Sequence, residues 1–137
     1  MLSDSIRSLI LEEHGRQAVS FIEGVDLDAY LARLADNAEI VSDSLPGRCR
    51  GFVAFYCNDM VTKRAYITLV LVDPQDRGLG IGRALVAFVL DVARRRGFTS
   101  CRLEVGKDNQ VAYNMYRSQG FRTIEDRSDN YLCEVAL

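Results

Sequence analysis

The fold is decided by the stretch VDPQDRGLGIGRAL, residues 72–85 of the chain. It starts at the end of a segment rich in β-forming residues, Ala65 to Val72. Pro74 should stop that strand, because proline cannot donate a ladder hydrogen bond. Glycines alternate at positions 78, 80 and 82, and a helical pattern of apolar residues begins at Ile81. The stretch is therefore predicted to join a strand to a helix through a glycine-rich loop.

Such a junction favours an anion, because helix N-termini present free N–H groups and glycines let the backbone approach a phosphate. Arg77 and Arg83 add positive charge beside the loop. A P-loop would need Lys-Ser or Lys-Thr after the glycines, and a dinucleotide fingerprint fails in both registers, at Arg83 or Leu85. The remaining pattern is R-x-x-G-x-G, from Arg77 to Gly82. A flexible turn with no ligand is the alternative.

The other segments predict an α/β (α+β) fold with a mixed, mostly antiparallel central sheet flanked by helices. Helices are expected at residues 2–13, from Asp26 or Asp28 onward, from 81 to the stop at Gly97, and from Asn109 to Gly120. Strands are expected at 39–42, 51–57, 65–72, 100–105, 121–125 and 131–137, the last two paired. One apolar helix face is predicted to comprise Ile81, Ala84, Leu85, Phe88, Val89 and Val92.

The composition excludes several classes of function. A chain of 137 residues suits one domain, residues 1–137, and a net charge of −2 offers no field for nucleic acid. The four cysteines are scattered, so buried reduced thiols are expected rather than disulfides or a zinc site. His14 is the only histidine, which argues against a histidine metal site or a Ser-His-Asp triad. With no signal peptide or membrane span in view, a cytoplasmic protein is expected.

Residues 72–85 resemble the acetyl-CoA-binding motif, Q/R-x-x-G-x-G/A, of the GNAT superfamily of N-acetyltransferases. A second block is similar to the strand-helix-strand segment of that family, and it comprises Leu103-Glu104-Val105, Asn109, Ala112, Tyr116 and Gly120-Phe121. The similarity runs from about Gly51 to Phe121. Residues 1–40 depart from the pattern, and we expect a shortened or altered N-terminal part there.

The resemblance implies splayed strands at an acetyl-CoA site and transfer of the acetyl group to a primary amine by direct attack, without a metal. The acceptor could be an amino sugar, a small amine or a protein α-amine, and the oligomeric state is left open, a homodimer included. Tyr56-x-Asn58-Asp59 is similar to a pattern of acetyltransferases encoded near sugar-biosynthesis genes. The implied cofactor contacts are Leu71, Val72, Arg77, Gly78, Leu79, Gly80, Ile81, Gly82, Arg83 and Asn109.

Two residues carry the implied chemistry. Tyr116 matches the family's general acid, which protonates the departing thiolate, although a core tyrosine is the alternative. Glu104 is the candidate general base, with a solvated strand carboxylate as the alternative. Tyr30 and Tyr131 could line the acceptor cleft or simply pack. A non-catalytic CoA-binding module and, more remotely, a nucleotide-binding regulator are the competing functions. A pure binder has no need for Tyr116 and Glu104, and the failed fingerprints argue against the nucleotide-binding regulator.

Overall fold

The structure, a computed structural model, describes residues 2–16 and 27–137. Its helices are α1 (Asp4–Arg16), α2 (Leu27–Asn37), the 3-10 turn η1 (Pro74–Asp76), α3 (Ile81–Arg95) and α4 (Gln110–Ser118). Its strands are β1 (Glu39–Leu45), β2 (Arg48–Tyr56), β3 (Arg64–Val72), β4 (Ser100–Gly106), β5 (Arg122–Asp126) and β6 (Asn130–Ala136). They form one six-stranded sheet in the order β1-β2-β3-β4-β6-β5. Only β3 and β4 pair in parallel among these strands. The predicted fold class and the pairing of the two closing strands are confirmed.

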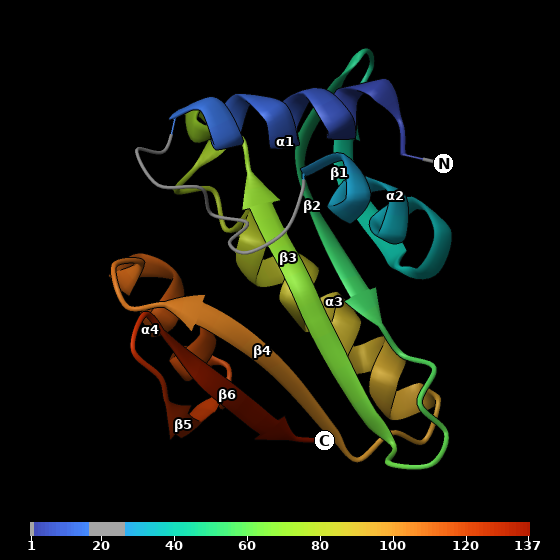
Figure 1. Cartoon of the computed structure of the whole chain (residues 1–137), viewed down its shortest axis with the longest axis vertical. Helices are drawn as coiled ribbons and strands as arrows, with labels where there is room; N and C mark the ends of the chain where they lie inside the picture. Colours follow the sequence, from blue (N-terminus) through green and yellow to red (C-terminus); the bar gives the residue numbers. More distant parts are fainter. Residues whose placement is uncertain (1, 17–26) are drawn as a thin grey trace.

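Helices cover the sheet on both faces (Figure 1). Apolar side chains of α1 and α2, among them Ile10 and Leu34, pack with Phe52 of β2 in one buried cluster. The other face carries a second cluster, in which α3 and α4 pack against the central strands. α1 and α2 lie over β1 to β3, so the same face of β4, β6 and β5 has no helix over it in the described part of the chain.

The predicted apolar face of α3 is partly wrong. Phe88 is 48% exposed and Ala84 is also exposed. The inner positions belong instead to Ile81, Leu85, Val86, Val89, Leu90 and Ala93. Both stripes have helical spacing, and the helix is turned so that residues 86, 90 and 93 meet the sheet while 84 and 88 face solvent. The sequence offered two overlapping apolar stripes, and contact with the sheet selected one.

All four cysteines are free and buried, which confirms the expectation of unpaired thiols. Cys101 and Cys133 sit in β4 and β6, and their side chains are fully covered. Within residues 2–16 and 27–137, no helix is long and apolar enough to cross a bilayer.

Candidate active site

β3 and β4 run side by side and then diverge. Their parallel pairing begins at Arg64–Ser100 and ends at Ile67–Leu103. Beyond that point β3 continues beside β2, and β4 continues beside β6 (Figure 1). We call these divergent ends, Thr68–Val72 of β3 and Glu104–Gly106 of β4, the β3–β4 split. The splayed strands implied by the sequence resemblance are therefore present.

A bulge in β3 marks the start of the split. Ala54 pairs with Leu69 while Phe55 pairs with Ile67, so Thr68 is the extra residue. A bulge bends its strand and strengthens the local twist. Here the bend falls directly after the last β3–β4 pair, where it directs the end of β3 away from β4.

The glycine loop lies at the far end of the split, between η1 and α3. Gly78 and Gly80 have φ values of 84° and 80°, which L-residues rarely adopt, and a Cβ at either would meet nothing within 4 Å. Ala84 N–H bonds to the Gly80 carbonyl at 3.0 Å and closes the first helical turn. Among the described residues, the N–H groups from Gly78 to Arg83 have no protein acceptor. Open space therefore lies beside the glycines of the loop, and the N–H groups of the loop can bind an anion.

The loop's two arginines are engaged by the protein. Arg77 donates from Nε to the Val72 carbonyl at 3.3 Å and from Nη2 to Glu13 at 3.5 Å. Arg83 donates from Nη1 to the Ser118 hydroxyl at 2.8 Å, which ties α3 to the end of α4. Both side chains stay exposed beside the loop, so they add positive charge there without being free.

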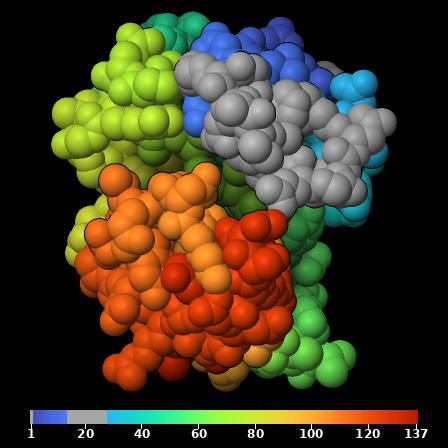
Figure 2. Space-filling view, turned by 60° about the vertical axis from the view of Figure 1, so that its left-hand side comes forward, coloured from blue at the N-terminus to red at the C-terminus, as the bar shows by residue number. Residues whose placement is uncertain are grey.

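In Figure 2 the segment around residues 75–80, in yellow-green, lies next to the orange part of the chain, to which β4 and α4 belong. The glycine loop and the end of β3 form one side of the β3–β4 split, and the end of β4 forms the other. Leu71 and Val72, the strand residues predicted to align the cofactor arm, end β3 on the same side as the loop.

Tyr116 projects from α4 into the core. It is 7% exposed, its ring meets Phe121 edge-on at a centroid distance of 5.9 Å, and it shares its cluster with Val105 of β4. Burial, with a smaller contribution from Cys133, raises the pKa of Tyr116 to about 12. Its hydroxyl has no hydrogen bond within the described residues. At neutral pH this group is protonated and can donate a proton or a hydrogen bond.

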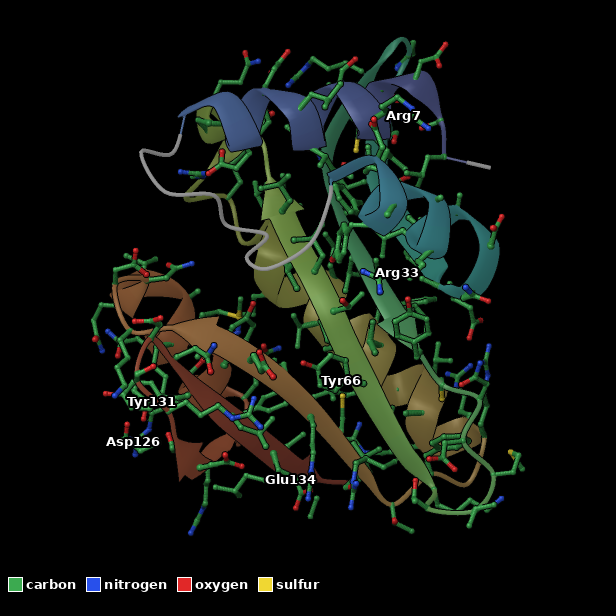
Figure 3. All side chains as sticks on the ribbon, viewed as in Figure 1. Arg7, Arg33, Tyr66, Asp126, Tyr131 and Glu134 are labelled. Atoms are coloured by element: carbon green, nitrogen blue, oxygen red, sulfur yellow. The ribbon has the colours of Figure 1, made fainter. Side chains whose placement is uncertain are left out.

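Glu104 is the first residue of β4 beyond the last β3–β4 pair, on the opposite face from Tyr116. Its side chain is 40% exposed, and it forms an ion pair with Arg127. The Tyr66 hydroxyl lies beside it: burial and then the Glu104 carboxylate raise the pKa of Tyr66 to about 12. Figure 3 shows Tyr66 on the face of β3 toward the viewer. Glu104 is thus a partly exposed carboxylate at the start of the split, with Arg127 and Tyr66 beside it.

Asn109 is the N-cap of α4, and its side chain accepts a hydrogen bond from Ala112 N at 3.3 Å. That is a structural role. Its contact with a cofactor stays a prediction, and the exposed position leaves the amide nitrogen available.

Asn58 and Asp59 belong to the β2–β3 turn, where the Asp59 carboxylate accepts from Val61 N and Thr62 N at 3.1 and 3.0 Å. This turn precedes β3, at the opposite end of that strand from the glycine loop. The turn interpretation is confirmed, and the residues have no position from which to bind an acceptor at the split.

The two other tyrosines differ. Tyr30 of α2 shares a 3.3 Å hydrogen bond with Thr68, the bulge residue at the split. Tyr131 packs on Tyr113 at a ring distance of 4.9 Å, with Lys107 over its ring. Packing is therefore the observed role of Tyr131, while Tyr30 reaches the site.

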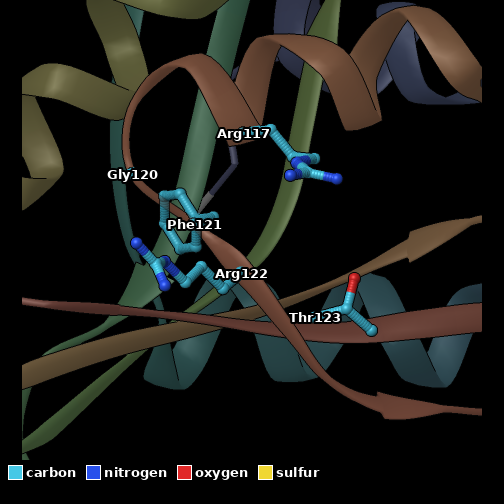
Figure 4. A pocket seen from close by; sticks show the side chains of 5 residues that line it. All are labelled: Arg117, Gly120, Phe121, Arg122 and Thr123. Atoms are coloured by element: carbon cyan, nitrogen blue, oxygen red, sulfur yellow. The ribbon is translucent and has the colours of Figure 1, made fainter.

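A cavity of about 600 Å³ lies elsewhere, between the end of α4 and the start of β5 (Figure 4). It is lined by Arg117, Gly120, Phe121, Arg122 and Thr123. None of the predicted site residues lines it, and β5 is the sheet edge farthest from β3 in strand order. The candidate site is therefore defined by the split and the loop, not by this cavity.

Sequence reasoning missed three residues near the site. Arg48 holds Asp76 of η1 with a bidentate ion pair, which fixes the approach to the glycine loop. Tyr66 and Arg127 flank Glu104. A tyrosine two residues before the bulge and an arginine in a hairpin turn carry no local pattern that distinguishes them from surface residues.

The split, the glycine loop and the sheet order define an acyl-CoA-type transferase fold, and the chain belongs to the acetyltransferase (GNAT) family, whose pattern matches residues 5–121. The match starts well before Gly51, so most of the N-terminal region that was expected to depart falls within it. An uncharacterised N-acetyltransferase of Methanocaldococcus jannaschii is 40% identical over 83 residues, 58% of this chain and 37% of that protein.

The ribosomal protein bS18-alanine N-acetyltransferase of Escherichia coli is 33% identical over 78 residues, 57% of this chain and 53% of that protein. The matches thus span 37% and 53% of these two relatives' lengths. Among solved structures, the NatC complex bound to Gag peptide and CoA has a chain that superposes with a TM-score of 0.74 at 23% identity, over 97% of this chain and 89% of that one.

Proposed function

We propose that this chain transfers an acetyl group from acetyl-CoA to a primary amine by direct attack in a ternary complex. The observation that carries the proposal is the combination of a β3–β4 split with a glycine loop whose N–H groups have no acceptor among the described residues, in a chain of the GNAT family. The split supplies strand edges for an extended arm, and the loop supplies donors for a diphosphate.

Acetyl-CoA fits this site as a substrate. The N–H groups from Gly78 to Arg83 would hold the pyrophosphate, because no described residue accepts from them and because no Cβ stands in the way at Gly78 and Gly80. Leu71 and Val72 would align the pantetheine arm through their backbone at the end of β3. Asn109 would bind the arm from the start of α4. The thioester would then lie at the split, with Glu104 on one face of the sheet and Tyr116 on the other.

The chemistry needs a neutral amine, since a free alkylamine is almost wholly protonated at neutral pH. Glu104 would take that proton. The amine nitrogen then attacks the thioester carbonyl, a C–N bond forms, the C–S bond breaks, and the nitrogen releases its second proton to solvent as the amide forms. Tyr116 would give its proton to the departing thiolate, for which its protonated state at neutral pH is suited. The products are an N-acetyl amine and free CoA.

Small amines, amino sugars and protein α-amines remain the acceptor classes. The Escherichia coli relative acts, by its name, on the alanine of a ribosomal protein. On the face of the sheet that carries Glu104, the described part of the chain places no helix over β4, β6 and β5, which supports an acceptor as large as a polypeptide end. A non-catalytic CoA-binding module is not favoured, because it would have no use for Tyr116 or Glu104.

Calorimetry with acetyl-CoA, ATP and NAD tests the binding half of the proposal. We expect acetyl-CoA alone to bind and to raise the thermal midpoint, since a ligand of the native state stabilises it. Stabilisation by ATP or NAD, with none by acetyl-CoA, would overturn the assignment.

A further inference from the structure

Arg127 links two carboxylates beside the split, Glu104 and Glu125. Its Nη1 donates to Glu104, and its Nε and Nη2 donate to Glu125 at 3.0 and 3.4 Å. The residue sits in the β5–β6 turn, where its own N–H bonds to the Asn130 carbonyl at 3.0 Å. Arg127 is therefore held both through its backbone N–H and through its guanidinium group.

Glu104 needs such an anchor because of where it lies. Its β4 neighbour Leu103 makes the last pair with β3, so the β3 side of Glu104 has no strand beside it. A glutamate side chain on an exposed strand has several rotamers. In the described chain, the charged and titratable groups around Glu104 include Tyr66 from β3 and Arg127 from the β5–β6 turn, with Glu125 behind Arg127 and the charge of Arg102 from β4 acting on Glu125.

The charges of this cluster do not cancel. One arginine serves two glutamates, so Glu104, Glu125 and Arg127 together carry one excess negative charge. The neighbouring pair on the same face, Arg102 with Glu134 at 2.6 Å, is matched one to one. An excess negative charge at the split attracts an amine in its protonated, cationic form.

We infer that Arg127 is a positioning residue that holds the Glu104 carboxylate at the split, ready to accept the proton of an incoming ammonium. This inference rests on the proposed transferase function. Tyr66 of β3 lies beside the same carboxylate.

The test compares Arg127→Gln with Arg127→Lys, and uses Arg102→Gln as the matched control from the same face. Turnover of acetyl-CoA by the wild type is first measured with spermidine, glucosamine and an alanyl peptide amide. The variants are then compared with the amine that reacts fastest. Loss of positioning should lower kcat/KM of Arg127→Gln by between about tenfold and a hundredfold. The loss should fall on kcat, with the KM for acetyl-CoA unchanged, because the contacts of Arg127 in the described chain are with Glu104, Glu125 and Asn130 and not with the glycine loop. Arg127→Lys should recover part of the loss in kcat.

A readout independent of the acceptor is the mobility of the Glu104 side chain, measured by ¹³C relaxation of its carboxyl group. The side chain should become more mobile in Arg127→Gln and stay as ordered as in the wild type in Arg102→Gln. Equal kinetics and equal mobility of Glu104 in these two variants would overturn the inference, with the wild type still active. A wild type that binds no acetyl-CoA would overturn the proposed function and the inference with it. If the wild type binds acetyl-CoA but acetylates none of the three amines, the mobility of Glu104 decides, and an unchanged mobility in Arg127→Gln overturns the inference.

Discussion

Replacing Gly80 by aspartate tests the glycine loop as the diphosphate site. Gly80 has φ +80° and no atom within 4 Å of a built Cβ, so the side chain enters open space at the start of α3. The carboxylate would stand near the expected pyrophosphate. At about 5 Å and an effective dielectric constant of about 20, each pair of charges costs roughly 3 kcal/mol. That corresponds to at least about a hundredfold in affinity.

Gly97→Asp is the matched control. Gly97 has φ +82°, also has nothing within 4 Å, and follows the other end of α3. The left-handed backbone strain, about 1–2 kcal/mol, is therefore common to both variants. A negative charge is favourable at a helix N-terminus and unfavourable at the C-terminus. Gly97→Asp should thus be the less stable of the two, so a loss of binding confined to Gly80→Asp cannot be attributed to unfolding.

The assay is calorimetric titration with acetyl-CoA, alongside thermal unfolding of each variant. We expect Gly80→Asp to lose measurable binding and Gly97→Asp to keep its Kd within about twofold. Gly82→Asp introduces the same charge at an ordinary φ and should also lose binding. Wild-type affinity in a folded Gly80→Asp protein would refute the reasoning, as would equal losses at both ends of α3.

Two substitutions probe the chemistry, and one labelling experiment probes the core. Tyr116→Phe should lower kcat by about a hundredfold or somewhat less and leave acetyl-CoA affinity and the thermal midpoint unchanged, because its hydroxyl has no hydrogen-bond partner in the part of the chain that the structure describes; unaltered kcat with chemistry rate-limiting would remove it from the mechanism. Glu104→Gln should show a rate deficit that shrinks as pH rises, since more of the amine deprotonates unaided; a deficit constant with pH would argue against a base. All four cysteines should resist a thiol reagent at pH about 8 until the protein unfolds, as burial raises the pKa of Cys101 to about 12; fast labelling of the native protein would contradict their burial.

Local signals predicted the elements well. The glycines of residues 78–82 and the stop at Pro74 fixed the strand-loop-helix junction, and Asn109 was expected to open α4, where it is the N-cap. Alternation in residues 100–105 placed Leu103 and Val105 inside and Glu104 outside, as observed. These features depend on neighbours a few residues apart, which is why the sequence displays them.

Features that depend on distant partners were not predictable. The bulge at Thr68 follows from pairing with β2 and from the divergence of β4. Arg48 and Asp76 are 28 residues apart, and Arg127 and Glu104 are 23 apart. Neither pair has a spacing that a periodicity could reveal. The orientation of α3 failed for the same reason, since the sheet and not the helix decided whether Phe88 faced inward.

Amine-dependent release of the CoA thiol tests the central claim most directly. Purified protein is incubated with acetyl-CoA, with and without each primary amine, while free thiol and acetylated amine are quantified together. The account predicts equal amounts of both products, formed only when protein, acetyl-CoA and an accepting amine are all present. Thiol release at the same rate without any amine, or acetyl-CoA binding with no transfer to any amine across all three acceptor classes, would contradict it.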